Sequence, residues 1–326
     1  MKIPIVITSI NNPTEAVKKF SKLIDFSLIL VGDNKTPKDW KYKNIQFLSI
    51  EEQRKKYPNL SKLVTENHYA RKLFGYLEAI KLNPEYIYET DDDNIPDSNF
   101  PNFLFKESKI TELNTKEISL NIYSFFTKKN IWPRGIPLSY IQKKVNIKKN
   151  RIEIFPYIQQ GLANLDPDVD AIYRLTNGDF VTFDANKRFA ISKGTFSPFN
   201  TQNTLFHKKF FPLMYLPSTV SPRATDIWRG YIAQRILWEF DSRLVYLSPS
   251  VYQKRNFHNL MKDFNDEIEV YKKTDKIINV ISSIKTLKGS VSKMLLSVYK
   301  ILVINKFFDD QELLRVEVWL SELRKV

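Results

Sequence analysis

Hydrophobic and polar positions in the first ninety residues follow two alternating periods. Residues 3–10, 26–31, 45–48 and 86–90 are short apolar runs rich in β-branched and aromatic residues, which is typical of buried strands. Between most of them, apolar side chains recur every three or four residues, the spacing of one helical face. Strands and helices that alternate in this way predict a parallel sheet covered by helices, which is an α/β fold.

Local signals bound two of the helical segments. Asn12 is a candidate N-cap, because Pro13 lies in the first turn and Glu15 follows three residues after the cap. A longer periodic stretch covers residues 66–82 and stops before Pro84. We therefore expect one helix after the first strand and another before the last strand of this part.

The rest of the chain has a different pattern. Residues 117–126 and 171–175 are strand-like pieces between proline-bearing loops. Residues 226–240 have the periodicity of a helix with a buried stripe, and the chain is predominantly helical and lysine-rich from about residue 262 onward. These patterns predict a mixed second part followed by a helical extension.

The composition excludes several classes of protein. The 326 residues are 43% hydrophobic and 13% aromatic, as expected for a folded globular chain. Cysteine is absent, which excludes disulfides, thiolate nucleophiles and thiolate metal ligands. No apolar stretch of about 18 residues is present, and the N-terminal residues lack a secretory signal pattern, so we expect a cytoplasmic protein.

The formal net charge of +14 raises the question of a charged partner. Nucleic acid, anionic membranes and phosphorylated small molecules would all be attracted, whereas a solvated lysine-rich surface needs no partner. No nucleic-acid partner is expected, because the chain has no long basic run and no recognition signature. Between residues 276 and 308, lysines interrupt an apolar helical stripe. That segment either lies peripherally on the anionic inner face of a membrane or packs on the rest of the protein.

Three consecutive aspartates follow the strand at 86–90. If the extended conformation continued, Asp91 and Asp93 would project to one side and Asp92 to the other. A pair of carboxylates suits Mg²⁺ or Mn²⁺, which complete their coordination with waters and substrate phosphates. The alternative is a solvated acidic turn in which Asp93 or Asn94 acts as a cap.

A second candidate group lies in the helix at 226–240. We expect Asp226 in its first turn, where the helix dipole and the free backbone amides favour an ionised carboxylate. Such a group can serve as a general base that accepts a proton from a hydroxyl. It can equally be a simple N-cap.

The polar groups elsewhere are less specific. His68 is expected to be a surface or capping residue, and His207 lies in a packed aromatic segment. The loop at 132–135 either binds a ligand or forms a rigid turn packed by its indole. These residues alone do not name a function.

Several strings between about residues 4 and 260 occur in an order that resembles one known family, the STELLO glycosyltransferases. The strings are VGDNKTP (31–37), YETDDDN (88–94), IWPRGIPL (131–138), DPDVDAIYRL (166–175), DIWRGY (226–231) and residues 6–10, 13–17, 69–72, 75–77, 199–204 and 233–235. The resemblance implies a GT-A fold, a Rossmann-like fold of nucleotide-diphospho-sugar transferases, with a C-terminal helical extension here. It also implies an Asp-x-Asp site for Mn²⁺ or Mg²⁺.

The resemblance implies roles for individual residues. The donor-binding group is Thr8, Ser9, Asp33, Arg71, Lys72, Asp91 and Asp92. The metal ligands are Asp91, Asp93 and His258. His258 is chosen because GT-A enzymes often recruit a late histidine for the metal, and a structural histidine is the alternative. Ordinary turn or helix-surface chemistry is the alternative for Thr8, Ser9, Asp33, Arg71 and Lys72.

Together these features predict a metal-dependent, inverting glycosyltransferase with Asp226 as its base. The donor would be a nucleotide-diphosphate sugar, with a UDP-sugar expected, and the acceptor a glycan or a lipid-linked molecule. Two alternatives stay open: a nucleotide-sugar mutase of the reversibly glycosylated polypeptide kind, which is similar in fold and acidic motif, and a non-catalytic scaffold that binds nucleotide-sugars. The domains would be 1–260, with a nucleotide-sugar half (1–100) and an acceptor half (101–260), and a helical extension at 261–326.

Overall fold

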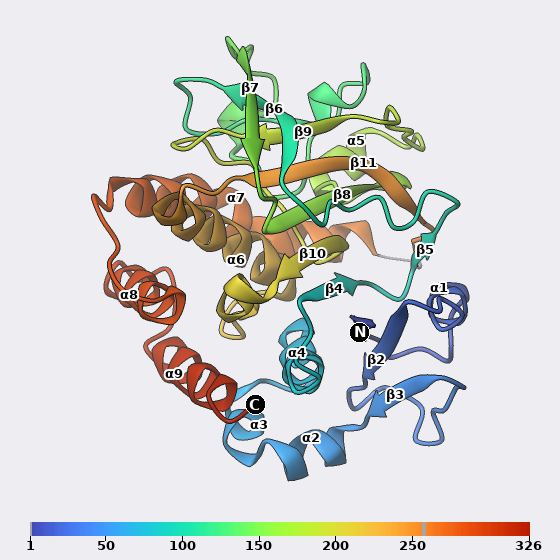
Figure 1. Cartoon of the computed structure of the whole chain (residues 1–326). Helices are drawn as coiled ribbons and strands as arrows, with labels where there is room; N and C mark the ends of the chain where they lie inside the picture. The colour runs from blue at the N-terminus through green and yellow to red at the C-terminus, as the bar shows by residue number, and fades with distance from the viewer. Residues whose placement is uncertain (1, 256–258) are drawn as a thin grey trace.

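A single mixed β-sheet runs through the molecule (Figure 1). The computed structural model describes residues 2–255 and 259–326. The strands are β1 (Ile3–Thr8), β2 (Phe26–Val31), β3 (Ile45–Leu48), β4 (Tyr86–Thr90), β5 (Asn94–Pro96), β6 (Ser108–Asn114), β7 (Lys148–Ile154), β8 (Ile158–Leu165), β9 (Arg188–Ile191), β10 (Asn203–His207) and β11 (Leu244–Gln253). Their order is β3-β2-β1-β4-β10-β8-β11-β9-β6-β7, with β5 paired to β11.

Helices cover both faces of this sheet. The α-helices are α1 (Glu15–Phe20), α2 (Ile50–Lys56), α3 (Pro58–Leu63), α4 (Lys72–Ile80), α5 (Ala171–Thr176), α6 (Pro222–Leu237), α7 (Leu260–Ser283), α8 (Val291–Ile304) and α9 (Gln311–Leu323). The 3-10 helices are η1 (Tyr69–Arg71), η2 (Ile122–Phe125), η3 (Leu138–Tyr140), η4 (Lys208–Met214) and η5 (Trp238–Phe240). The expected α/β fold of the GT-A kind with C-terminal helices is confirmed.

The N-terminal half is a parallel sheet in the order β3-β2-β1-β4. β1 is buried on both faces, because Val6 packs with the α4 side of the sheet while Ile5 and Ile7 pack with the α1 side. This two-sided burial explains why the strands read as continuous apolar runs. β1 lies between β2 and β4, and a chain reversal at such a point opens a crevice at the carboxyl ends of the strands.

Gly75 lets α4 lie directly on β1 and β2. A Cβ atom at this position would come within 2.5 Å of a methyl group of Val6 and 2.6 Å of one of Val31. A larger residue would therefore push α4 away from the sheet. Because Tyr69 and Lys72 sit at the start of this helical segment, its close seating fixes their position beside β4.

An ion pair inside the protein connects the two halves. Arg229 of α6 donates two hydrogen bonds to Glu89 of β4, at 2.7 and 3.1 Å, and both side chains are almost completely buried. The hydroxyl of Tyr76 also donates to Glu89. Glu89 is thus satisfied within the core, and α6 is held at a fixed position relative to the end of β4.

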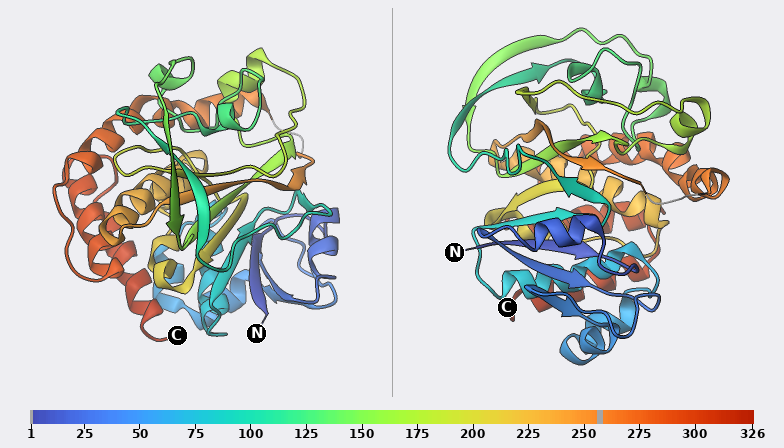
Figure 2. Two further views of the ribbon diagram at one scale, coloured as in Figure 1. Left: turned by 45° about the horizontal axis from the view of Figure 1, so that its top comes forward. Right: turned by 90° about the vertical axis from the view of Figure 1, so that its right-hand side faces the viewer.

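The C-terminal helices pack along one flank of the sheet (Figure 2). α7 and α8 contact α6, and α9 contacts α3 and α4 near the other end of the chain. Glu312 of α9 is buried and accepts hydrogen bonds from the Tyr215 hydroxyl and from the backbone N–H of Thr219 at 2.9 Å. The extension is therefore docked on the α/β part.

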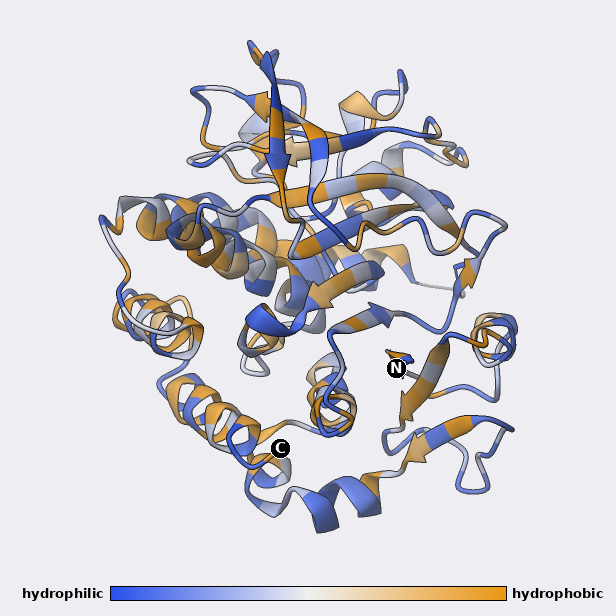
Figure 3. Cartoon of the chain, viewed as in Figure 1, coloured by the Kyte–Doolittle hydropathy of each residue, from blue (hydrophilic) through white to orange (hydrophobic). Residues whose placement is uncertain are grey.

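The apolar stripe of this extension is used for packing. Ile284 and Ile301 are half-buried, and the other residues of the predicted stripe are buried: Ile281, Leu287, Val291, Met294, Leu295 and Val298. Figure 3 shows hydrophobic and hydrophilic residues side by side along α8 and α9, as expected for helices with one packed face. The packed alternative for residues 276–308 is thus the one observed. Within the described ranges, no helix is both long and apolar enough to cross a membrane.

Some expected elements differ in the structure. Helix α1 is capped by Thr14 and not by Asn12. The segment 276–308 is not one helix: it contains the end of α7 and then α8, whose N-cap is Ser290. The strand expected at 171–175 is the helix α5, because the Asp170 carboxylate caps it through the Tyr173 N–H at 2.8 Å.

Residues 117–126, also expected as a strand, contain only the 3-10 turn η2 and one isolated bridge. The sequence patterns missed α2 and α3, which are six or seven residues long and therefore carry little periodicity. The domain boundaries at 100 and 260 stay predictions, although α7 does begin at Leu260.

Candidate active site

A cavity of about 740 Å³ opens at the carboxyl ends of β1, β2 and β4. Its wall is completed by the starts of α6 and α7 and by the loop before β10. Among the lining residues are Thr8, Ser9, Asp33, His68, Tyr69, Arg71, Asp91, Asp92, Asp93, Arg134, Asp168, Arg174, Asn200, Thr201, Gln202, Arg223, Asp226, Gln253 and Arg255. The cavity lies at the crevice between β1 and β4, where open α/β sheets bind their ligands.

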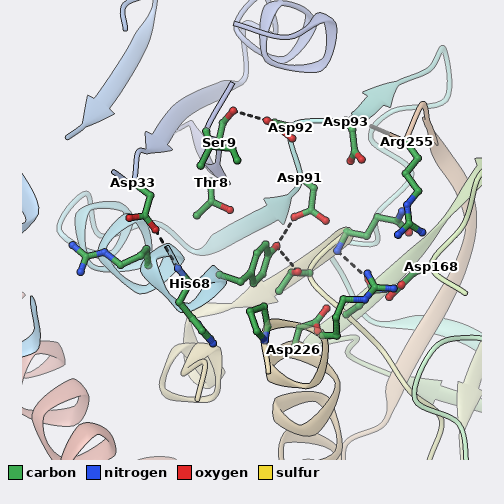
Figure 4. A pocket seen from close by; sticks show the side chains of 18 of the residues that line it. Thr8, Ser9, Asp33, His68, Asp91, Asp92, Asp93, Asp168, Asp226 and Arg255 are labelled. Carbon is green, nitrogen blue, oxygen red and sulfur yellow. Dashed lines mark hydrogen bonds between the residues drawn. The ribbon is translucent and has the colours of Figure 1, made fainter. Parts of the chain in front are cut away.

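Asp91 is held in place from one side. Its carboxylate, labelled in Figure 4, accepts hydrogen bonds from the Tyr69 hydroxyl and, at 3.2 Å, from the Lys72 ammonium. Lys72 is fully buried and also donates to the Thr90 carbonyl at 2.6 Å. The Tyr69 hydroxyl lies 2.5 Å from the hydroxyl of Thr201. Lys72 therefore contacts Asp91 directly and does not line the cavity.

Asp93 is the least compensated of the three aspartates. Its carboxylate accepts hydrogen bonds only from neutral amides, at 2.8 Å from Gln253 and at 3.4 Å from Asn94, among the described residues. Burial, and then the negative charge of Asp91, raise the pKa of Asp93 to about 7. A carboxylate in this state gains from any cation that arrives beside it.

Asp92 turns away from the other two aspartates toward the end of β1 (Figure 4). Its side chain accepts hydrogen bonds from the Ser9 hydroxyl and, at 2.9 Å, from the Asn11 amide. Its backbone carbonyl accepts from the Thr14 hydroxyl at 2.5 Å. Both Asp92 and Ser9, predicted to bind the donor, thus also tie the β1–α1 loop to the aspartates.

The alternation expected for an extended chain does not persist here. β4 ends at Thr90, and Asp92 and Asp93 lie in a turn before β5. Asp91 and Asp93 nevertheless both line the cavity, because the turn and not the strand pleat directs their side chains. The separate placement of Asp92 agrees with the expectation, although the reason differs.

The residues at this edge fit a hard divalent cation. Two carboxylates face the cavity, and oxygen ligands are the type that Mg²⁺ and Mn²⁺ prefer. Across the described ranges, no cluster of three or more acidic or histidine side chains is placed to hold a metal. An ion here would therefore take its remaining ligands from water and substrate phosphates. His258, the predicted extra ligand, lies outside the described residues.

The other predicted donor-binding residues line the opposite part of the cavity. Thr8 ends β1, and the Asp33 carboxylate follows β2 and accepts from the His68 N–H at 3.2 Å (Figure 4). His68 caps η1, as expected of a capping residue. Arg71 reaches the cavity wall, but its guanidinium donates to Gln53 at 2.8 Å and is buried.

One arginine joins Asp226 to a second carboxylate. Arg134 donates to both oxygens of Asp168 at 2.8 and 2.9 Å and to both oxygens of Asp226 at 3.1 and 3.0 Å. The Asn200 amide adds a bond of 2.6 Å to Asp168. Burial opposes ionisation of Asp168, but the adjacent Arg134 charge lowers its pKa below the ordinary value. Asp226 is reached by the same guanidinium and faces the cavity.

Helix α6 begins one turn earlier than expected. Ser221 is its N-cap and Pro222 its first residue, so Asp226 lies in the second turn. The simple N-cap alternative for Asp226 is therefore excluded. The loop that carries Arg134 lies tightly against α6. A Cβ atom at Gly135, the next residue, would come within 2.2 Å of Ile227, so a larger residue there would push the loop away from Asp226.

The loop at 132–135 is a rigid turn and also contributes to the cavity wall. The Trp132 indole is buried and donates to Asp170 at 2.8 Å, which makes the loop a rigid turn. Arg134 from the same loop lines the cavity. His207 packs against the rings of Tyr86 and Phe155, as expected from its aromatic neighbours.

Reasoning from the sequence did not assign roles to several polar residues of the cavity. These are Arg134, Asp168, Arg174, Asn200, Thr201, Gln202, Arg223, Gln253 and Arg255. Most of them lie in or beside the strings that resemble the STELLO family, and this resemblance was the one feature of the sequence that pointed to them. Their convergence depends on tertiary contacts that no local pattern reports.

Comparison with known proteins adds the decisive observation. A family model described as STELLO glycosyltransferases matches residues 223–326. The chain is also 28% identical over 343 residues to "Probable glycosyltransferase STELLO2" of Arabidopsis thaliana, a match that covers 99% of this chain. The chain is thus similar to STELLO glycosyltransferases over nearly its whole length. A second Arabidopsis thaliana relative, "Probable glycosyltransferase STELLO1", is 28% identical over 98% of this chain.

The STELLO-type similarity has a defined extent. The chain spans 44% of the length of each of these two relatives, so less than half of either protein. The match to the family model includes α6, with Asp226 and Arg229, and all of the C-terminal helices. The part of the cavity formed by α6 and α7 therefore falls inside the matched segment.

Proposed function

We propose that this STELLO-type chain is a metal-dependent glycosyltransferase that uses a nucleotide-diphosphate sugar. A UDP-sugar is the first candidate donor, and the acceptor is a hydroxyl of a glycan or a lipid-linked molecule. The observation that carries the proposal is the pair Asp91 and Asp93 at the crevice between β1 and β4, in a cavity of about 740 Å³. That volume lies in the range of small-molecule sites.

The polar groups of the cavity suggest how a donor would lie. The nucleoside would occupy the side formed by Thr8, Asp33 and His68, at the ends of β1 and β2. Its diphosphate would then extend toward Asp91 and Asp93 at the end of β4. This direction follows the general placement of nucleotides across the carboxyl edge of such sheets.

Asp91 and Asp93 would hold Mn²⁺ or Mg²⁺ together with the donor diphosphate. When bound, such an ion would neutralise the charge that develops on the diphosphate leaving group. Lys72 and Tyr69 fix the Asp91 carboxylate, so its position needs little reorganisation when ligands arrive. The raised pKa of Asp93 supports the same role, since a nearby cation would favour its ionised form.

The transfer step would use Asp226 as the base. The acceptor oxygen attacks the anomeric carbon as the bond from that carbon to the diphosphate oxygen breaks. Asp226 takes the hydroxyl proton, and the nucleoside diphosphate leaves with the bonding electrons. Attack from the face opposite the leaving group gives inversion. Arg134 keeps Asp226 oriented toward the cavity through its two hydrogen bonds.

A screen of nucleotide-sugars tests this function. Thermal unfolding is measured with each donor in the presence of Mn²⁺ and in EDTA, and each stabilising donor is then assayed for release of nucleoside diphosphate with candidate glycan and lipid-linked acceptors. We expect one donor to stabilise the protein only with metal and to be consumed only with an acceptor. Ring isomerisation of the donor without acceptor would establish a mutase instead, and binding without turnover across the acceptor panel would favour a scaffold.

A further inference from the structure

Three arginines line the cavity on the side away from Asp33 and His68. Arg174 comes from α5, Arg223 from the first turn of α6, and Arg255 from the segment after β11. In Figure 4 the side chain of Arg255 points into the cavity between Asp93 and Asp168. Residues from three separate elements thus present guanidinium groups to one space.

Each of these arginines has a carboxylate partner but keeps unused donors. Arg174 pairs with Asp166 and Arg223 pairs with Glu267. Arg255 donates from Nη2 to Asp263 at 2.6 Å. A guanidinium has five N–H donors, so one carboxylate does not satisfy it. The Nε atom of Arg174 is buried and has no hydrogen-bond partner in the described chain.

The positive charges of this cluster also act on one another. Burial, followed by the positive charges of Arg174 and Arg223, lowers the pKa of Arg255 to about 10. Like charges at this range repel one another, and an oxyanion among them would remove the repulsion. Asp263 and Asp266 also line the cavity, where they pair with Arg255 and Lys262.

The backbone at two helix ends also favours an anion at this place. α6 begins at Pro222 and α7 at Leu260, and the first turns of both helices contribute lining residues to the cavity. The caps Ser221 and Asn259 already accept N–H groups of these first turns, so what each helix end adds is its partial positive charge. The arginines therefore lie where two helix dipoles also favour an anion.

A second hollow continues from this point. It has a volume of about 300 Å³ and shares Arg174 and Arg255 with the main cavity. Its wall includes Phe180, which is 71% exposed, and Leu260. The two arginines thus stand between the main cavity and an outer surface with apolar side chains.

We propose that Arg174, Arg223 and Arg255 form a subsite for a phosphate group of the acceptor. That the phosphate belongs to the acceptor rests on the proposed function, whereas the presence of an oxyanion subsite rests on the arginines alone. A phosphate monoester fits because its several oxygens can accept from guanidinium groups that approach from different sides. The rest of the acceptor would extend into the second hollow, and it is either a soluble sugar phosphate or a lipid-linked phosphate.

The rival explanation is that the arginines bind the diphosphate of the donor, because Arg255 also lies near Asp93. The two explanations differ when the donor site is filled. A phosphate subsite for the acceptor stays open in protein saturated with UDP and Mn²⁺. A donor-diphosphate site does not.

The test is a calorimetric titration of the full chain with phosphate monoesters in the presence of saturating UDP and Mn²⁺. Glycerol 3-phosphate is the soluble probe, farnesyl phosphate is the lipid probe, and glycerol is the uncharged control. The variants are Arg174→Gln and Arg255→Gln, with Arg255→Lys as the conservative change. Arg151→Gln, an exposed arginine on β7, is the matched control. Thermal unfolding of each variant confirms that it is folded.

We expect both phosphate probes to bind the UDP-loaded protein at least tenfold more weakly in the Gln variants, with no change in Arg151→Gln. Tighter binding of farnesyl phosphate by tenfold would assign a lipid source, and equal binding a soluble one. The proposal is overturned if the probes compete with UDP, if they fail to bind, or if the arginine variants lose UDP affinity instead. If UDP itself does not bind, the proposed function fails, and the arginine dependence of phosphate binding to the free protein still decides on the subsite.

Discussion

Asp226 and Asp168 share the guanidinium of Arg134, and this arrangement keeps both carboxylates fixed at the cavity wall. Asp226→Asn preserves the shape of the side chain but removes its ability to accept a proton. We expect kcat to fall by roughly 10²- to 10⁴-fold, as is usual for loss of a general base. Donor affinity should change little, because the proposed position of the nucleotide is on the Asp33 side. A steady-state assay measures both quantities.

Asp241→Asn is a suitable control for that experiment, because its side chain is 83% exposed and does not line the cavity. An Asp226→Asn enzyme with near-native turnover would end the assignment. Loss of turnover in the control would show that the assay is sensitive to charge changes in general.

Glu78 provides a pH-dependent test at the level of one residue. Burial alone would raise its pKa, but hydrogen bonds from Lys56, Lys81 and Tyr57 lower the pKa from 4.5 to about 2. A carboxylate with a lowered pKa stabilises the fold above pH 4.5 and loses this contribution as the pH falls toward 2. Glu78→Gln should therefore lower the free energy of unfolding by about 1 to 3 kcal/mol at neutral pH.

Urea unfolding of both proteins at several pH values checks this expectation. The difference in unfolding free energy between wild type and Glu78→Gln should shrink as the pH falls below 4.5. A difference that stays constant down to pH 3 would contradict the assigned ion pairs.

Only part of the site could be predicted from single residues. Asp91 and Asp93 were found because a β-rich run ends in an acidic cluster, which is a local pattern. Arg134 was not, because its partners Asp168 and Asp226 lie 34 and 92 residues away. Contacts over such separations are created by the fold, and a single sequence does not display them.

At the scale of elements, α6 is fixed to β4 by the buried pair Arg229–Glu89. Arg229→Met would leave Glu89 buried without its charged partner, which costs about 3 to 5 kcal/mol. The double variant Arg229→Met, Glu89→Met would remove both charges and should recover part of that loss. Chemical denaturation measures the three free energies. A single variant as stable as wild type would mean that the pair does not hold α6.

Elements were predictable where burial makes a long, uniform pattern. β2 and β4 match the expected residues because they are buried on both faces of the parallel sheet, and β3 matches too although it is a partly exposed edge strand. α5 was mistaken for a strand because its six residues are too few to show a helical period. Its N-cap, Asp170, was the signal that could have corrected the assignment.

At the scale of the whole molecule, the positive charge and the docked C-terminal helices bear on membrane contact. The apolar stripe of α7 and α8 is buried in the protein, so it is not free to insert into lipid. Contact with an anionic surface would then depend on lysine charge alone, at about 1 kcal/mol for each lysine near the surface. Flotation with anionic vesicles at low salt should therefore disappear at about 1 M salt, where the Debye length is about 3 Å.

Flotation that persists in high salt would contradict this account, because it would require insertion of an apolar segment. Neutral vesicles are the control, and the protein should not float with them at any salt concentration. The sequence left this question open, since a packed and a membrane-bound amphipathic helix have the same periodicity. The contacts of α7 and α8 with α6 are what distinguish them.

The central claim is that Asp91 and Asp93 hold a divalent cation together with a nucleoside diphosphate. Calorimetric titration of UDP into the protein, once with Mn²⁺ and once with EDTA, tests it most directly. We predict far tighter binding with Mn²⁺, and loss of that metal effect in Asp93→Ala, with the exposed-site variant Asp241→Asn behaving as wild type. Equal UDP affinities with Mn²⁺ and with EDTA in the wild-type protein would contradict the account.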